Sequence, residues 1–253
     1  MSGNETEFDV VAADLYKRFG KNEVLKGMTL RVRKGETFVI VGRSGIGKSV
    51  FLKHIVGLMH PDRGEIRVFG KDIRDLSGDE LLEHRRCIGM VFQHSALLNS
   101  LTVEENVALG LTENGMKDMD EVRRIVNEKL SQVRMDGTND QLPETLSGGM
   151  KKRVAVARTL ALGPRIILFD EPTTGLDPIM SDNVDDLILD LREQVGCTCV
   201  VVTHDMITAF RVADRIGLFH DGRLIEVAAP EDFRKSERPE VREFIGRESK
   251  WRD

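Results

Sequence analysis

The alternation of apolar and polar positions divides the chain into three zones. From Val10 to about Gly89, β-type runs (EVLKGMTLRV, ETFVIVG and GEIRVFG) surround one predicted helix, KSVFLKHIVGLM, which ends at HPDRG. Between about residues 95 and 162 the pattern becomes helical. Apolar residues recur there at steps of three and four among charged ones: Met119, Val122, Val126, Leu130 and Val133. We therefore predict a unit of strands and helix followed by a helical insertion.

The third zone begins after Pro164 and mixes strands with a helix. The strands RIILFD and CTCVVVTHD flank an amphipathic helix, SDNVDDLILDLREQV, and this order is typical of a parallel sheet. The segment RIGLFHDGRLIEV then predicts a β-hairpin with Asp-Gly at its turn. No linker isolates a second domain. We predict an α/β fold in which a single domain spans residues 8–247, with residues 248–253 as a C-terminal tail.

Composition narrows the class of protein. The chain has 253 residues, of which 40% are hydrophobic, so it can bury a sizeable core. Acidic residues outnumber basic ones by 42 to 37, and this balance argues against nucleic acid as a partner. The opening MSGNETEFDV lacks the features of an export signal, and no stretch approaches the roughly 20 apolar residues that cross a bilayer. We expect any membrane role to depend on a partner.

The cysteines favour a reducing compartment. Cys197 and Cys199 fall on one face of a predicted buried strand, and with Cys87 the total is three. An odd number argues against a disulfide framework, so we interpret them as reduced core residues of a cytoplasmic protein.

The segment GRSGIGKS predicts a phosphate-binding loop. It fits G-x-x-x-x-G-K-[ST], follows the apolar run TFVIV and precedes a predicted helix. Glycines let the backbone amides approach phosphate oxygens, and the helix N-terminus adds positive potential. We expect Lys48 to reach the β- and γ-phosphates and Ser49 to bind Mg²⁺. The predicted ATP-binding residues of the loop are Gly42, Arg43, Ser44, Gly45, Ile46, Gly47, Lys48 and Ser49.

Two adjacent carboxylates end the later strand RIILFDEP. Asp170 and Glu171 would lie at the carboxyl edge of a parallel sheet, where ligands usually bind. We expect Asp170 to support Mg²⁺ and Glu171 to act as the general base toward water. The alternative is a pair of solvated acids in a turn.

LSGGM, which starts at Leu146, resembles the signature motif of the ATP-binding cassette (ABC) family. The chain also carries VFQ with Gln93, GLDP with Asp177 and VVTHD with His204, in the order and approximate spacing of that family. The resemblance runs from about Val10 to Val227. It implies a P-loop NTPase of the ABC ATPase type, with a mixed sheet core, an antiparallel β subdomain and a helical subdomain at about residues 95–162.

The resemblance also implies roles for single residues. Phe19 matches the aromatic residue that stacks on adenine, although Tyr16 is close enough to be an alternative. Gln93 matches the residue that contacts Mg²⁺ and the attacking water. His204 matches the histidine that contacts the γ-phosphate. With Lys48 and Glu171, these two complete the expected catalytic group.

The family dimerises head to tail, which implies a purpose for the signature segment. The amides of Ser147, Gly148 and Gly149 would cap the γ-phosphate held by the other subunit, and Asp177 would lie at the dimer seam. We therefore expect an ATP- and Mg²⁺-dependent homodimer with two composite sites. Two departures from the common pattern, Met150 and Gly175, remove no catalytic group.

Longer segments resemble the cassettes of the Mla and Mce phospholipid transport systems (MlaF-like cassettes). These segments are LSGGMKKRVAVARTLAL, FDEPTTGLDPI, GRSGIGKSV, FQHSALLNSLTVEENVAL and PEDFRKSERPEVREFIGR. The resemblance implies a peripheral ATPase at the cytoplasmic face of the inner membrane, beneath a permease dimer similar to MlaE and working with a lipid-binding Mce-domain protein. The alternatives are a glycine betaine, sulfonate or other small-solute importer, a non-transport cassette, and a P-loop kinase. The apolar segment SALL, residues 95–98, would either receive the permease or simply be buried.

Overall fold

The computed structural model describes residues 7–249 of the chain, whose strands form two sheets. An antiparallel sheet of four strands has the order β2-β1-β4-β5. Its members are β1 (Phe8–Phe19), β2 (Asn22–Arg33), β4 (Arg63–Val68) and β5 (Lys71–Asp72). A six-stranded sheet has the order β10-β9-β3-β8-β7-β6. Its members are β3 (Thr37–Val41), β6 (Ile88–Val91), β7 (Ile166–Asp170), β8 (Thr198–Thr203), β9 (Arg215–His220) and β10 (Arg223–Ala228).

The six-stranded sheet is mixed, as predicted. Neighbouring strands from β9 through β6 pair in parallel, whereas β10 pairs antiparallel with β9 at the edge. The predicted hairpin is also confirmed, because His220 faces Arg223 across the turn at Asp221 and Gly222. Both turn residues have positive φ, 42° and 76°, which is the geometry of a type I′ turn.

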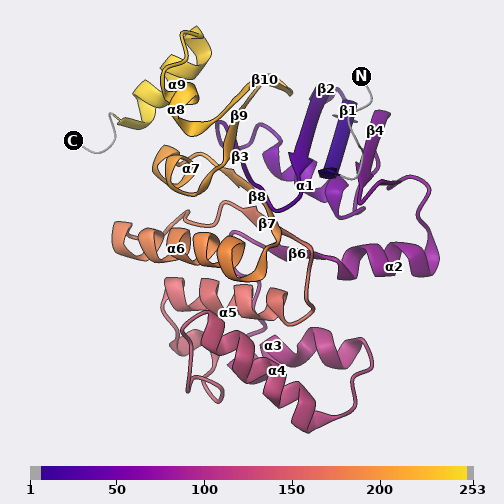
Figure 1. Cartoon of the computed structure of the whole chain (residues 1–253), viewed down its shortest axis with the longest axis vertical. Coiled ribbons are helices and arrows are strands. Elements are labelled where there is room, and N and C mark those ends of the chain that lie inside the picture. Colours follow the sequence, from indigo (N-terminus) through magenta and orange to yellow (C-terminus); the bar gives the residue numbers. More distant parts are fainter. Residues whose placement is uncertain (1–6, 250–253) are drawn as a thin grey trace.

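The helices include the predicted insertion. In Figure 1, α3 and α4 lie together at the end of the molecule remote from the antiparallel sheet, and α5 lies between them and α6. The helices are α1 (Lys48–Ile55), α2 (Gly78–Arg86), α3 (Val103–Glu113), α4 (Met119–Gln132), α5 (Gly148–Leu160), α6 (Pro178–Val195), α7 (Met206–Val212), α8 (Pro230–Arg234) and α9 (Pro239–Ser249), with a short 3-10 turn at Pro143–Thr145.

The structure corrects three details of the sequence analysis. The first zone holds a second helix, α2, which the apolar pattern misses because His84 is the buried residue of this polar segment. Strands β1 and β6 were not among the predicted runs. Met119 is 61% exposed rather than part of the apolar stripe, because it is the first residue of α4, next to the Asp118 cap.

The core has two parts, one on each face of the six-stranded sheet. Within β3, Val39 and Val41 face the helical side, whereas Phe38 and Ile40 face α1 and the antiparallel sheet. Because successive side chains point to opposite faces and both faces are covered, every residue of β3 is buried. The centre of the sheet is therefore covered on both faces.

The cysteines and the C-terminus can be compared directly with the predictions. Cys197 and Cys199 are buried and free, with their Sγ atoms 4.0 Å apart, and Cys87 is a free, half-buried thiol. The predicted domain boundary at residue 247 falls inside α9. Residues 250–253 of the predicted tail lie outside the described residues. No helix among residues 7–249 is long and apolar enough to span a membrane.

Candidate nucleotide site

The predicted phosphate loop connects β3 to α1. Gly47 precedes the helix with φ of 110°, and a Cβ atom there would lie 2.1 Å from Cγ1 of Val24. A Cβ atom at Gly42 would lie 2.6 Å from the carbonyl oxygen of Phe219. Both positions therefore require glycine for packing within this chain, before any ligand is considered.

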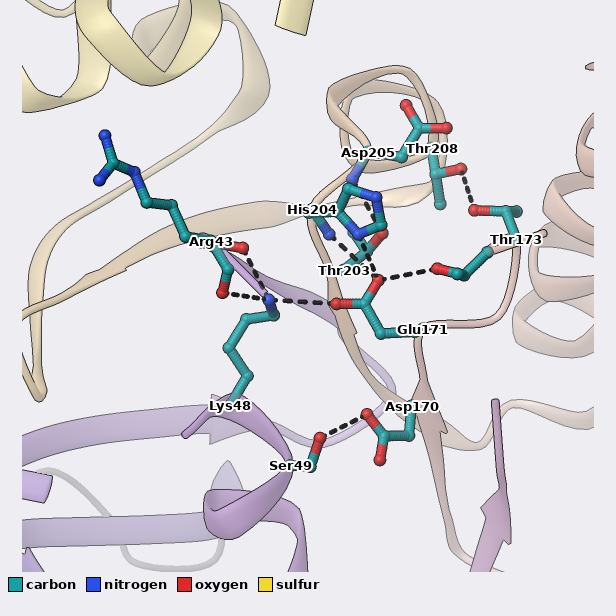
Figure 2. A network of polar contacts seen from close by, with 12 residues as sticks. Arg43, Lys48, Ser49, Asp170, Glu171, Thr173, Thr203, His204, Asp205 and Thr208 are labelled. Carbon is teal, nitrogen blue, oxygen red and sulfur yellow. Dashed lines mark hydrogen bonds and ion pairs between the residues drawn. The ribbon is translucent and has the colours of Figure 1, made fainter. Parts of the chain in front are cut away.

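Lys48 lies between the loop and the end of β7. Its side chain is buried, and Nζ donates hydrogen bonds to the carbonyl oxygens of Gly42 at 2.6 Å and Arg43 at 3.0 Å. Nζ also pairs with Oε1 of Glu171 at 3.1 Å. Figure 2 shows this ammonium group between the loop and the carboxylate. The contacts fix a positive charge where the sequence predicts bound phosphate.

Ser49 and Asp170 provide neighbouring oxygen atoms. Oγ of Ser49 donates to Oδ1 of Asp170 at 2.7 Å, which joins the start of α1 to the end of β7 (Figure 2). A hydroxyl and a carboxylate are the hard oxygen donors that Mg²⁺ prefers, so this pair fits the predicted ion. The described residues contain no cluster of three or more His, Cys, Asp or Glu side chains for a metal. A magnesium site beside nucleotide phosphates does not require such a cluster, because phosphate and water complete the shell.

Glu171 is held in an unusual conformation. Its φ is 50°, which is sparsely populated by residues other than glycine and costs about 1–3 kcal/mol. Its Oε2 accepts hydrogen bonds from Nδ1 of His204 at 2.8 Å and from Oγ1 of Thr174 at 3.1 Å. Burial by itself would raise the pKa of Glu171, but the His204 hydrogen bond and the Lys48 charge outweigh it and lower that pKa. The carboxylate is therefore ionised at neutral pH and available as a proton acceptor.

A cavity of about 330 Å³ brings these groups together. Gln93, far from the others in sequence, lines the same cavity as Glu171 and His204. Sequence reasoning missed Thr174, since a threonine in a loop carries no signal of its own. The lining residues are Ser44, Gly45, Gly47, Lys48, Ser49, Val50, Gln93, Glu171, Thr174 and His204.

Sequence comparison places this cavity in a known family. A model of the ABC transporter family matches residues 25–174, from β2 to the loop after β7. The chain belongs to the ABC transporter family. It is an ATPase domain, or cassette, of that family.

The relatives of this cassette carry different names. It is 41% identical over 231 residues to the probable ribonucleotide transport ATP-binding protein mkl of Mycobacterium tuberculosis, covering 91% of this chain and 64% of that protein. It is 38% identical over 257 residues to the chloroplastic protein TRIGALACTOSYLDIACYLGLYCEROL 3 of Arabidopsis thaliana, covering 95% and 74%. The methionine import ATP-binding protein MetN of Rhizobium johnstonii is 41% identical, with 84% of this chain and 59% of that protein covered.

Solved structures confirm the fold of the cassette. The structure of cbiO1 from Clostridium perfringens, part of the ABC transporter complex cbiONQ, matches with a TM-score of 0.83 and 28% identity over 95% of this chain and 99% of that one. The cassette MJ0796, solved as a dimer with ADP and Pi, matches with a TM-score of 0.78 and 36% identity over 87% and 98%. The predicted P-loop architecture with mixed and antiparallel sheets is therefore confirmed.

The signature segment of the cassette lies outside the cavity of its own chain. Ser147 caps α5, where its Oγ accepts from the amide of Met150 at 3.3 Å. Neither this serine nor Gly148 or Gly149 lines the 330 Å³ cavity. The two glycines also have an intrachain reason to lack side chains. A Cβ atom would lie 3.0 Å from Leu176 at Gly148 and 2.8 Å from Met180 at Gly149. The predicted contact of these glycines with a partner subunit stays a prediction.

The other predicted contacts have defined settings. Phe19 ends β1 and is 44% exposed, which suits an aromatic platform, although the Lys17 ammonium lies 5.9 Å from its ring centroid. The Arg63 guanidinium lies closer to the Tyr16 ring, 4.9 Å from its centroid. Asp177 caps α6 by accepting from the amide of Met180 at 3.0 Å. In the segment SALL, Leu97 packs on the core while Leu98 is 46% exposed, so burial and a permease contact each suit one of the two leucines.

A buried carboxyl group is linked by two threonines to the segments that carry Glu171 and His204. Asp185 of α6 is 1% exposed, and its Oδ2 accepts from Oγ1 of Thr208, which in turn lies 3.3 Å from Oγ1 of Thr173. These threonines come from the segments that follow His204 and Glu171 (Figure 2). Oδ1 of Asp185 has no hydrogen-bond partner among the described residues, and burial raises the pKa of this carboxyl to about 7.

The shifted pKa of Asp185 predicts a pH-dependent stability. Between the ordinary value of 3.8 and about 7, the folded state binds the proton more tightly than the unfolded state. This contribution is present below 3.8 and is lost as the pH rises through about 7. We expect Asp185→Asn to raise the free energy of unfolding at pH 8 by an amount on the order of 2 kcal/mol, and to flatten its fall between pH ~5 and ~8.

Urea unfolding at the two pH values measures this effect. Asp186→Asn is the matched control, because Asp186 is a half-exposed neighbour that pairs with Arg211. We expect the control to change stability by less than about 1 kcal/mol without altering its pH dependence. A loss of stability at pH 8 in Asp185→Asn would contradict the prediction.

Proposed function

We propose that this cassette is the ATPase subunit of a transporter that moves phospholipid between membranes. It would work as a homodimer, with ATP and Mg²⁺ at two composite sites, beneath a permease dimer similar to MlaE. The complex would sit at the cytoplasmic face of the inner membrane and include a lipid-binding Mce-domain protein. Two observations support this proposal: the resemblance of long segments to the Mla and Mce cassettes, and the match to the Arabidopsis protein, which is named after a glycolipid and is covered to 74% of its length.

The arrangement of Lys48, Glu171 and His204 carries the catalytic part of the proposal. Glu171 accepts a proton from the attacking water, because its carboxylate is ionised and held by the other two side chains. Lys48 and His204 then stabilise charge on the γ-phosphate, and Gln93, which lines the same cavity, orients the water. Bound Mg²⁺, held by Ser49, Asp170 and Gln93, would neutralise phosphate charge.

A small-solute importer is the second candidate. The match to the methionine import protein MetN supports it, with 41% identity over 84% of this chain. The chain spans 59% of that relative and 64% of mkl, so the activity of either whole protein does not follow for this chain. The substrate class therefore needs a direct test.

The general-base role of Glu171 predicts a separation of binding from turnover. Glu171→Gln keeps the shape and a hydrogen-bonding side chain but cannot accept the proton. We expect ATP affinity within about threefold of wild type and a fall in kcat of at least ~100-fold, with a dimer that persists in ATP. Steady-state hydrolysis and ATP-dependent gel filtration measure these effects. Near-normal hydrolysis would exclude Glu171 as the base.

The composite site predicts complementation between two inactive variants. Gly148 is exposed, and its contact at 3.0 Å is the end of the Leu176 side chain, so Gly148→Asp disturbs its own chain less than a change at buried Gly149. We expect Gly148→Asp to melt like wild type, bind ATP and fail to close the dimer, whereas Lys48→Ala loses ATP binding.

Mixing these two variants gives heterodimers with one intact and one doubly defective site. We expect ATP-dependent dimerisation to return in the mixture, although neither variant dimerises alone. If Gly148→Asp alone hydrolyses ATP at the wild-type rate, the signature does not act in trans.

The proposed lipid substrate predicts which protein co-purifies with the chain and which compound stimulates its ATPase activity. We expect the tagged chain, purified from membranes in mild detergent, to bring a permease with it. In vesicles, added phospholipid should stimulate the ATPase activity of this complex about two- to tenfold, a change of roughly 0.4–1.4 kcal/mol in barrier. Stimulation by methionine or glycine betaine instead, with no response to phospholipid, would favour the importer.

A further inference from the structure

The helix that begins at the signature segment also holds the loop that carries Gln93. Lys152 lies on the second turn of α5, and its side chain is 3% exposed. Its Nζ donates hydrogen bonds to two consecutive carbonyl oxygens, those of Phe92 (at 3.0 Å) and Gln93. The ammonium group is thus hydrogen-bonded to the backbone of Gln93, which lines the catalytic cavity.

Burial destabilises the charged form of Lys152. Taking an ammonium group out of water costs several kcal/mol, and among residues 7–249 no carboxylate forms an ion pair with Lys152. Burial lowers the pKa of Lys152 to about 8, against the charge of Asp170, which raises it. The group nevertheless stays protonated at neutral pH. The two carbonyl contacts of Nζ and the nearby charge of Asp170 offset part of the desolvation.

The loop after Gln93 needs such contacts because its backbone is strained. Ser95 and Ala96 both have positive φ, 60° and 48°, which non-glycine residues rarely adopt. Arg158, further along α5, donates to the carbonyl oxygens of these same two residues at 2.9 Å and 2.6 Å. Two cations of one helix therefore hold four carbonyl groups of one loop.

We propose that Lys152 is a positioning residue that couples the signature segment to Gln93. This inference rests on the proposed function, in which the signature contacts the partner's nucleotide and Gln93 orients water. A shift of α5 moves Lys152, and through two hydrogen bonds it moves the backbone of Gln93. Closure on the partner's nucleotide thereby sets the position of the catalytic glutamine in the chain that supplies the signature.

Three variants and a neighbour test this coupling in the purified chain. Lys152→Met keeps the length and removes the donor, Lys152→Arg keeps a charged donor, and Lys152→Gln keeps a neutral one. Lys151→Met is the matched control, since its ammonium makes no hydrogen bond or ion pair with the described residues. The readouts are kcat, KM for ATP, melting temperature, and hydrogen exchange of the amides in residues 92–98.

We expect Lys152→Met to lower kcat by about 10- to 100-fold while KM stays within about twofold, because Gln93 is misplaced but the phosphate loop is intact. Exchange should rise in residues 92–98 and stay unchanged in α1. Lys152→Arg should recover most of the activity, and Lys151→Met should match wild type. If Lys152→Met does not fold, Lys152→Gln provides the same comparison, with an intermediate kcat expected.

Two results would overturn the inference. One is a Lys152→Met protein with wild-type kcat and unchanged exchange in the loop. The other is parallel loss of melting temperature and activity that Lys152→Arg does not rescue, which is the behaviour of a residue needed for folding alone. An inactive wild-type chain would instead count against the proposed ATPase mechanism, so the two failures are distinguishable.

Discussion

The whole site depends on the ion pair between Lys48 and Glu171, which joins the phosphate loop to the end of β7. Lys48 begins α1 after β3, Glu171 follows β7, and the hydrogen bond from His204 adds the end of β8. These three strands are adjacent and parallel, so their carboxyl ends meet at one edge of the sheet. Because both charged groups are buried, each needs the other, and removing one partner of such a pair typically costs about 3–5 kcal/mol. The strained backbone of Glu171 is tolerated because three neighbours hold its carboxylate.

A second layer of polar contacts links this centre to two helices, α6 and α5. On one side, Asp185 and two threonines connect α6 to the segments that follow Glu171 and His204. On the other side, Lys152 connects α5 to the Gln93 loop. Both links use a titratable group that is buried without a partner of opposite charge. Such groups weaken a fold compared with apolar residues of similar size, and they fix specific geometry in return.

The sequence predicted most reliably the parts of this fold that are built by local rules. β3, β7 and β8 are continuous apolar runs, the phosphate loop is a fixed spacing of glycines, and the Asp-Gly turn requires positive φ at both positions. The apolar pattern missed the polar helix α2, whose buried residue is His84, and nothing in the sequence distinguishes Lys152 from its neighbours Lys151 and Arg153. Nor could the contacts of Gly148 and Gly149 with Leu176 and Met180 be foreseen, since they depend on how α5 packs beside α6. These features depend on which residues are buried when the elements pack together, and a single sequence does not reveal that packing.

The relatives show why the ATPase activity of a cassette and the substrate of its transporter are separate questions. Proteins named for ribonucleotide transport, a glycolipid and methionine import all lie between 38% and 41% identity to this chain. The residues that line the cavity act on phosphate and water, and these are the same whatever a transporter moves. Substrate identity would then reside where a cassette meets other proteins, at surfaces such as exposed Leu98 beyond the Gln93 loop. On this view the Gln93 loop connects ATP hydrolysis to a particular transporter. Lys152 of α5 hydrogen-bonds to this loop, and exposed Leu98 offers a surface for a partner protein.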